Sequence, residues 1–111
     1  MLAAVHRLRA SAEFSEAFRR GRRAGRPLLS VHLHVTSDGA PPRVGLVVSK
    51  GVGGSVVRHQ VSRRLRHLLR DRLDRLPSGS RLVVRAAPAA GSASSEALAA
   101  DLDAALDRVI R

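Results

Sequence analysis

Residues 58–72 read R-H-Q-V-S-R-R-L-R-H-L-L-R-D-R and hold six arginines in fifteen positions. Apolar residues recur through and around this segment at the three-and-four spacing of a helix that packs one face against a core. They are Val57, Val61, Leu65, Leu68, Leu69 and Leu76. The stretch therefore predicts an amphipathic helix from Ser55 to about Leu76, ended by the P-S-G sequence that follows it.

The other side of this helix is basic. Its residues recur at i, i+4, i+7 and i+11 and are His59, Arg63, Arg66 and Arg70. A guanidinium group presents its donors in a planar fork that suits phosphate oxygens. A merely solvated face usually interleaves acids at i+4, and only Asp71 and Asp74 are available here. We therefore interpret this ridge as a surface that binds nucleic acid.

Length and charge set the class of protein. A chain of 111 residues forms one domain, and 20 basic against 9 acidic residues give a net charge of +11. This excess predicts a polyanionic partner. Residues 89–111 are the exception, since four acids there outnumber two arginines. We expect that acidic segment either to face away from the partner or to pack beside a basic one.

Several classes of protein are excluded or disfavoured. The chain has no cysteine, which rules out disulfides and thiolate metal sites and favours a cytoplasmic location. No apolar run approaches the roughly 18 residues of a membrane span, so no membrane partner is expected. The Arg- and Ala-rich start has some character of an organellar transit peptide, but Glu13 and Glu16 interrupt it, and the segment reads better as folded structure.

Two further helices flank the basic one. The first runs from a cap at Ser11 to about Arg20 and ends at Gly21, and a basic tail follows it. The last helix is capped by Ser94 or Ser95. Its apolar face consists of Leu98, Leu102, Ala105, Leu106 and Val109.

The remaining segments predict a small sheet. From Leu29 to Thr36 apolar residues alternate strictly with polar ones, which is typical of a half-buried strand. The turn D-G-A-P-P leads to a second strand at 44–49, close enough to pair with the first as a hairpin, and Leu82–Ala86 is another strand. The expected fold is α+β, a small single-domain α/β sandwich over 1–111 in the order α-β-β-(β)-α-β-α. The bracketed strand stands for one further break inside 28–49.

Three separated motifs together resemble the bacterial ribonuclease P protein subunit. The run V-G-L-V-V-S-K-G-V-G-G-S-V-V-R-H-Q-V-S-R-R-L-R, residues 44–66, is similar to the family's Lys-containing turn and its R-N-x-x-K-R-x-x-R helix. The opening R-L-R, the F-x-x-x-F pair and the basic tail after it match in order, as does R-x-x-P at 85–88. For the fold, the resemblance implies a left-handed β-α-β crossover, contrary to the usual right-handed preference.

The resemblance implies an accessory role in an endoribonuclease. In the family, a catalytic RNA subunit with bound Mg²⁺ cleaves precursor tRNA to leave the mature 5′ end, and the protein carries no catalytic residue and no tightly held metal. The protein holds the single-stranded 5′ leader between its sheet and first helix, in the bacterial cytoplasm. The partners implied are that RNA subunit and precursor tRNA, with no DNA.

The resemblance also implies two sets of binding residues. The set expected to contact the RNA subunit is Lys50, Arg58, His59, Arg63, Arg64, Arg66 and Arg70. The set expected to contact the leader is Phe14, Phe18, Arg7 and Arg9. Aromatic rings can stack on unpaired bases without needing a particular base, which suits an enzyme that processes every tRNA precursor. The residues that depart from the family pattern are Gly54 (frequently Asn), His59 (usually Asn), Gln60 (commonly Arg) and Ser62 (usually Lys).

Other interpretations of the same residues remain open. A structural RNA-binding protein, such as a small ribosomal protein, would have the same size and charge. A DNA-binding repressor would need a short turn from a preceding helix, which is missing. Phe14 and Phe18 at i, i+4 are also typical of core packing, and His32 with His34 would need a third ligand to hold a metal. K-G-V-G-G-S can clasp an RNA phosphate, but it lacks the G-K-[ST] ending of a nucleotide-binding loop.

Overall fold

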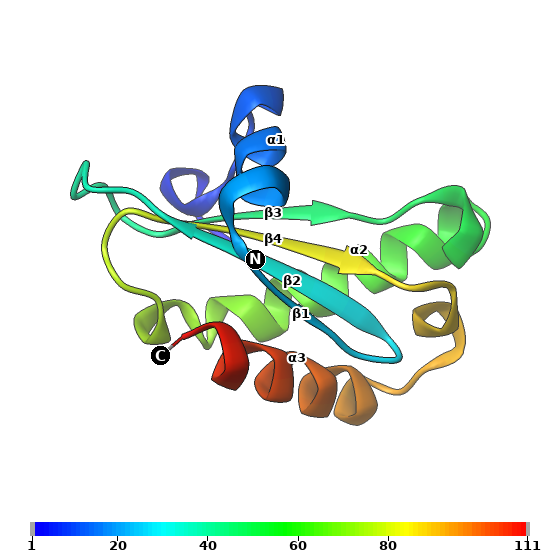
Figure 1. The fold of residues 1–111 in the computed structure, drawn as a ribbon. Helices are drawn as coiled ribbons and strands as arrows, with labels where there is room; N and C mark the ends of the chain where they lie inside the picture. The colour runs from blue at the N-terminus through cyan, green and yellow to red at the C-terminus, as the bar shows by residue number, and fades with distance from the viewer. Residues whose placement is uncertain (1, 111) are drawn as a thin grey trace.

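The structure is a computed structural model that describes residues 2–110 (Figure 1). Its helices are α1 (Ser11–Arg20), α2 (Ser55–Arg70) and α3 (Ser95–Val109). Its strands are β1 (Arg22–Gly25), β2 (Leu29–Val35), β3 (Arg43–Val47) and β4 (Ser80–Ala86). Short 3-10 turns connect them, namely η1 (Ala4–His6), η2 (Lys50–Val52), η3 (Leu73–Arg75) and η4 (Pro88–Ser92).

The sheet separates two layers of helices. Figure 1 shows α2 and α3 beneath the sheet and α1 standing above one part of it. The main core lies on the lower side, where alternate residues of β2 and β4 meet the apolar stripes of α2 and α3. Its fully buried members include Leu29, Val31, Leu82, Val84, Val61, Leu65, Leu69, Leu98, Leu102 and Leu106. Each such side chain contributes roughly 1.5–3 kcal/mol by leaving water, so this layer holds most of the fold together.

A second, smaller core fixes α1 to the upper face. Leu8, Ala17 and Val83 are buried there, with Phe14 and Val47 packed against them. Gly45 of β3 lies directly under the Phe14 ring, and a Cβ at that position would overlap the ring. Because α1 covers only part of the sheet (Figure 1), the upper face beyond it stays accessible to a partner.

The strand order is β1-β2-β4-β3. β4 pairs antiparallel with β2 and parallel with β3, and the chain passes from β3 to β4 through α2 on the lower face. The α+β class and the β-α-β crossover of the prediction are therefore present. The further strand break expected inside 28–49 is wrong, because the additional strand is β1, which precedes that range. Ser94 caps α3 as predicted, since its Oγ accepts a hydrogen bond from the Ala97 amide at 3.1 Å.

The predicted hairpin is wrong. β2 and β3 do not pair with each other, because β4 lies between them. The reason is the burial of β4, whose Leu82, Val83 and Val84 are inaccessible on both faces and so require the centre of the sheet.

Three local differences accompany this. The basic tail after α1 is a strand, β1, held by pairing with β2 although its residues have little strand propensity. α2 ends at Arg70 and η3 follows, while Leu76 still reaches the core. Ser11 is the first residue of α1 and not its cap, and no side chain caps that end.

Candidate nucleic-acid interface

The predicted ridge on α2 has the expected geometry. His59, Arg63 and Arg70 are exposed and Arg66 is half-exposed. The residues that α2 turns toward the sheet, Val61, Leu65 and Leu69, are buried. Arg70 makes only a loose contact with Asp71, 3.7 Å between Nε and Oδ1, and both side chains are largely in water. The ridge is thus a cationic surface whose role in binding RNA stays a prediction.

The other residues predicted to contact the RNA subunit lie around the start of α2. Lys50 is exposed in η2, which leads into the helix. Arg58 is half-buried, and its Nε has no hydrogen-bond acceptor within the part of the chain that the structure describes. Arg64 is exposed and donates from Nη1 to the Ala93 carbonyl at 3.2 Å. Gly54 offers no side-chain cap, so the first amides of α2 are open to an anion as the glycine-rich loop predicted.

The acidic C-terminal segment is expected either to face away from the partner or to pack beside a basic segment, and the structure shows that it packs beside a basic one. Asp103 accepts from Arg72 Nε at 2.6 Å and from Arg72 Nη2 at 3.0 Å. This pairing raises the pKa of Arg72 and lowers the pKa of Asp103. Arg75 binds both Asp103 and Asp107. The arginines beyond Arg70 are therefore neutralised by α3, and the cationic ridge ends at Arg70.

The two phenylalanines of α1 have different surroundings. Phe14 packs into the small upper core over Gly45. Phe18 is 39% exposed and meets His32 edge to face, with 4.6 Å between ring centroids. Phe18 is consequently the ring with a face available for stacking, and Phe14 chiefly holds the helix in place.

The two arginines predicted to contact the leader lie on the segment before α1. Arg7 forms a β-bridge with Val44 at the edge of β3 and donates from Nε to the Leu2 carbonyl at 3.1 Å. Arg9 is exposed. Arg7 is thus partly engaged in folding its own segment, and Arg9 is available to a partner.

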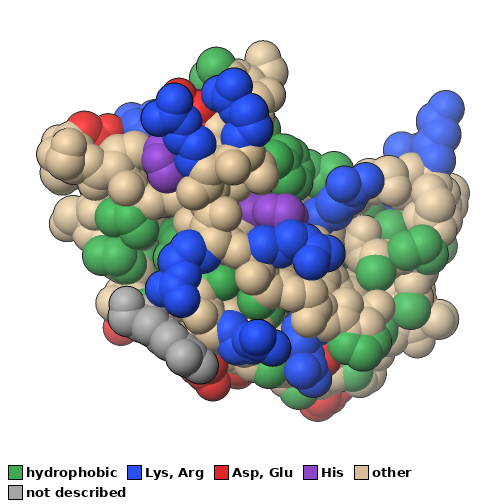
Figure 2. All heavy atoms as spheres, in the orientation of Figure 1, with side chains coloured by type: hydrophobic (Ala, Val, Ile, Leu, Met, Phe, Trp, Pro, Cys, Tyr) green, Lys and Arg blue, Asp and Glu red, His purple; other side chains and the backbone are tan. Residues whose placement is uncertain are grey.

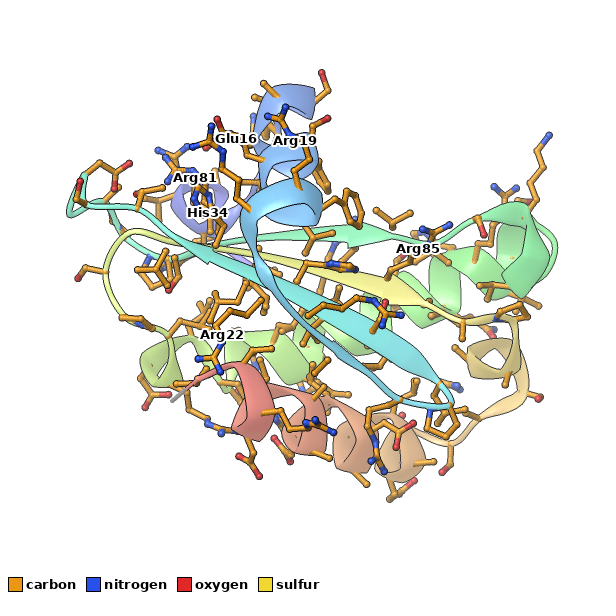
Figure 3. All side chains as sticks on the ribbon, viewed as in Figure 1. Glu16, Arg19, Arg22, His34, Arg81 and Arg85 are labelled. Carbon is orange, nitrogen blue, oxygen red and sulfur yellow. The ribbon has the colours of Figure 1, made fainter. Side chains whose placement is uncertain are left out.

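A hollow of about 680 Å³ opens on the upper face, where residues of β1, β2 and β4 and of their adjoining loops line it. Its lining includes Arg23 of β1, Ser30 and His32 of β2, Ser49, and Arg85 of β4. Figure 2 shows basic side chains around the histidines on this face, with acidic side chains mainly toward its margins. In Figure 3 Arg85 stands clear of α1 on the right, whereas His34 and Arg81 lie close beside the helix on the left.

His32 lies on the floor of this hollow and is 7% exposed. Burial lowers its pKa, and the positive charges of Arg23 and Arg85 lower it further, which favours the neutral form of the ring. Its Nδ1 has no hydrogen-bond partner within residues 2–110. Sequence reasoning missed Arg23, His32 and Arg85 as a group. The alternation of β2 does place His32 opposite the apolar face, but only the sheet order brings the arginines beside it.

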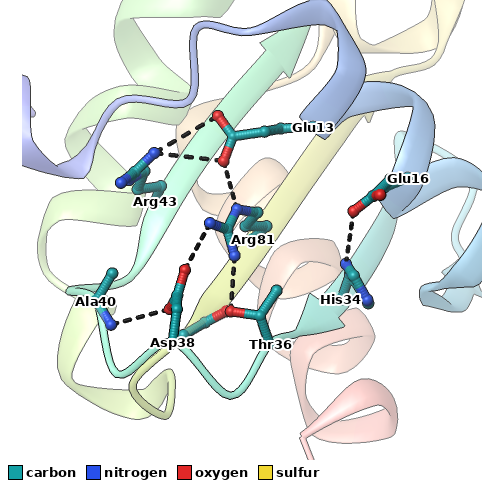
Figure 4. Close-up of polar contacts among 9 residues, drawn as sticks. Glu13, Glu16, His34, Thr36, Asp38, Ala40, Arg43 and Arg81 are labelled. Atoms are coloured by element: carbon teal, nitrogen blue, oxygen red, sulfur yellow. Dashed lines mark hydrogen bonds and ion pairs between the residues drawn. The ribbon is translucent and has the colours of Figure 1, made fainter.

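A charged network fixes the other end of α1 to the sheet (Figure 4). Arg81 of β4 donates to Glu13 of α1, to Thr36 Oγ1 at 2.7 Å and to Asp38 Oδ2 at 2.8 Å. Arg43 adds a second ion pair to Glu13 at 3.3 Å. The Ala40 amide and the Arg81 guanidinium, both bonded to Asp38, lower the pKa of that carboxyl to about 2. These contacts tie the first turn of α1 to β3 and β4.

No group of three or more metal-ligating side chains occurs among residues 2–110. His32 and His34 share a face of β2, but the His32 ring contacts Phe18, and His34 Nδ1 lies 3.9 Å from Glu16 Oε2. No third ligand joins them, as a metal site would require. Over the same residues, no helix is long and apolar enough to cross a membrane.

Comparison with known proteins gives consistent results. The family model for ribonuclease P matches residues 2–110. The ribonuclease P protein component of Streptomyces griseus is 59% identical, with 99% of this chain and 96% of the relative covered, and that of Thermobifida fusca is 53% identical, with 100% and 80% covered.

Solved structures agree on the fold. The Staphylococcus aureus RNase P protein matches with a TM-score of 0.85 at 19% identity, with 96% of this chain and 98% of that one covered. The Thermotoga maritima RNase P protein matches with a TM-score of 0.80 at 21% identity, with 93% and 96% covered.

Proposed function

The chain belongs to the ribonuclease P protein family, and from that membership we propose that it is the protein subunit of a bacterial ribonuclease P. In this role it binds the catalytic RNA subunit and the single-stranded 5′ leader of precursor tRNA, in the cytoplasm, and so promotes removal of the leader. The observation that carries the proposal is the distribution of arginines. Of the arginines that have no acidic partner among residues 2–110, Arg58, Arg63, Arg64 and Arg66 lie on α2, and Arg23 and Arg85 line the upper hollow, on the opposite side of the sheet.

The α2 ridge and the loop before it form the surface for the RNA subunit. Arg58, Arg63 and Arg66 supply guanidinium groups for phosphates, and the uncapped amides at the start of α2 add a neutral anion-binding element. A row of guanidinium groups along one helix face suits a folded RNA, whose backbone offers many phosphates at once.

The hollow forms the surface for the leader. Phe18 offers an aromatic face to an unpaired base and packs on His32, which lines the hollow together with Arg23 and Arg85. Stacking of this kind contributes roughly 1–3 kcal/mol per base and is tolerant of sequence.

Bond cleavage is assigned to the RNA subunit and its Mg²⁺. A protein site for phosphodiester hydrolysis with two metals needs converging carboxylates that are not engaged elsewhere. Here the carboxylates Glu13, Asp38, Asp101, Asp103 and Asp107 each bind an arginine of the same chain. The protein contributes affinity and positioning.

Reconstitution tests this function. The protein is mixed with a bacterial ribonuclease P RNA, and precursor-tRNA cleavage is measured at low Mg²⁺ with and without it. Strong stimulation of 5′ maturation is expected. Tight RNA binding without stimulation would instead identify a structural RNA-binding protein, and preference for duplex DNA would identify a repressor.

A further inference from the structure

Three side chains from three neighbouring strands converge in the upper hollow. Arg23 of β1 lies directly opposite His32 of β2, and Arg85 of β4 lies opposite Ser30, which makes it a diagonal neighbour of His32. Residues in these two relations have Cβ atoms about 5 Å and about 7 Å apart, within reach of a long side chain. Two guanidinium groups therefore flank one buried imidazole from either side.

Arg23, His32 and Arg85 form no ion pair with an acidic side chain among residues 2–110, unlike several other charged residues of the sheet. Arg23 and Arg85 are exposed and have no acidic partner among residues 2–110, whereas Arg81, on the same face of β4 as Arg85, binds two carboxylates. The imidazole Nδ1 is buried without a hydrogen-bond partner within the described range. Two unpaired guanidinium groups at a hollow that this imidazole also lines point to an anionic ligand.

We propose that Arg23, His32 and Arg85 form a subsite for one backbone phosphate of the leader, with the adjoining base against Phe18. This inference rests on the proposed function and specifies the chemistry of its leader surface. A phosphodiester carries the charge that two guanidinium groups complement, and single-stranded nucleic acid places an unpaired base next to it. The hollow is large enough, at about 680 Å³, to take such a segment.

Occupancy of this subsite is also linked to a proton. In the unoccupied protein, burial and then the charges of Arg23 and Arg85 lower the pKa of His32. A bound phosphate offsets both charges and adds a negative one, so it raises the pKa of the imidazole. The leader then binds more tightly at low pH, and this advantage is lost as pH rises through the pKa of the bound state.

Other groups near His32 do not supply this linkage. On α1, Phe18 packs against the His32 ring, and the acid Glu16 lies against His34. From β4, Val83 is its uncharged cross-strand partner, and from β1 only Arg23 adds charge on this face. On β2 itself, His34 stands two residues away and lies against Glu16 of α1.

The first test compares charge removal inside and outside the hollow. The reconstituted ribonucleoprotein binds precursor tRNA and mature tRNA, with calcium in place of magnesium so that turnover does not interfere. Arg85→Gln should weaken precursor binding about tenfold, leave mature tRNA unchanged, and reduce the slope of log affinity against log salt by about 0.7. Arg108→Gln, which removes an exposed arginine of α3, is the matched control and should change neither.

A chemical substitution in the leader identifies the phosphate. Uncharged methylphosphonate linkages, each on a 2′-O-methyl nucleotide, are placed singly along the leader and compared with the phosphodiester at the same nucleotide. One position should weaken binding to the wild-type ribonucleoprotein but not to Arg85→Gln. Equal losses in both proteins at every position would overturn the subsite.

The proton linkage is read from the same binding assay between about pH 5.5 and 8, where histidine ordinarily titrates. Wild-type preference for precursor over mature tRNA should decline with rising pH, and His32→Gln should remove that decline. The same decline in both proteins would refute the link between leader binding and protonation of His32.

The outcomes separate the two proposals. A wild-type protein that fails to stimulate cleavage refutes the proposed function. Stimulation together with identical behaviour of Arg85→Gln and Arg108→Gln refutes only the subsite. If Arg85→Gln instead weakens binding of the RNA subunit in the absence of tRNA, the hollow contacts that subunit and the inference is wrong.

Discussion

Replacing Arg81 with leucine should destabilise the protein by detaching α1 from the sheet. The Arg81 side chain is 13% exposed and the Glu13 side chain 20%, so their ion pair is largely shielded from water. The leucine removes three charge-assisted hydrogen bonds, to Glu13, Thr36 and Asp38. It leaves the half-buried Glu13 carboxylate with Arg43 as its cation.

The expected loss is about 2–3 kcal/mol in the free energy of unfolding. A hydrogen bond to a charged group contributes about 1.5–3 kcal/mol when it is shielded, but Asp38 is exposed and Arg43 still compensates Glu13, which keeps the total near the value for one or two such bonds. For a domain of this size the change corresponds to a fall of roughly 10 °C in Tm.

Denaturant and thermal unfolding measure the effect, and Arg85→Leu is its matched control. Arg85 lies on the same strand and face but has no acidic partner among residues 2–110, so its replacement should cost less than about 0.5 kcal/mol. A double-mutant cycle between Arg81→Leu and Glu13→Gln should give a coupling above about 1 kcal/mol. If Arg81→Leu costs no more than Arg85→Leu, the network does not hold α1.

Three further changes have distinct expected results. Phe14→Ala should lower the free energy of unfolding by about 3 kcal/mol because it empties the small core. Phe18→Ala should cost less than about 1 kcal/mol and reduce the preference for precursor over mature tRNA. If melting and binding measurements give the reverse order, the assignment of the two rings is wrong. Arg66→Ala should weaken binding to the RNA subunit about tenfold at an unchanged Tm, and Arg108→Ala should leave that affinity unaltered in a filter-binding titration. The folded-state pKa of Asp38 is lowered from 3.8 to about 2, so the stability that this carboxylate contributes is complete above about pH 4 and is lost as pH falls toward 2. Asp38→Asn should therefore flatten the acid side of the plot of unfolding free energy against pH. Identical plots for both proteins would exclude the contribution.

Local patterns predicted those elements whose partners are close in sequence or whose period is strong. The stripe of α2 and the alternation of β2 each identified the face that packs on the main core, because the spacing of apolar residues matches the period of the helix or strand that buries them. The end of α1 at Gly21 and the cap of α3 at Ser94 followed from local chemistry in the same way.

Pairing between distant segments could not be read from such patterns. Strand order depends on β4, whose burial on both faces shows only in a run of apolar residues that is also consistent with an edge. The bond between Arg81 and Glu13 joins residues 68 positions apart and has no local signal. The sequence therefore predicts a leader surface of Phe14, Phe18, Arg7 and Arg9, while Arg23, His32 and Arg85 come together only through the register of three strands. The handedness of the β-α-β crossover likewise came from the resemblance alone.

The placement of the few acids explains how one chain can carry so many arginines and still fold. Glu13 and Asp38 neutralise Arg81 at the base of α1, Asp101 pairs with Arg26 at 3.4 Å, and the acids of α3 neutralise the end of α2. Each acid thus reduces repulsion at a junction between elements, where close approach of like charges would oppose folding. Among the arginines without an acidic partner in residues 2–110, those of α2 and of the hollow stand on the two proposed RNA surfaces, where phosphates relieve their repulsion when RNA binds. Replacement of a paired arginine should therefore change stability first, and replacement of one on the ridge or in the hollow should change the salt dependence of RNA binding first.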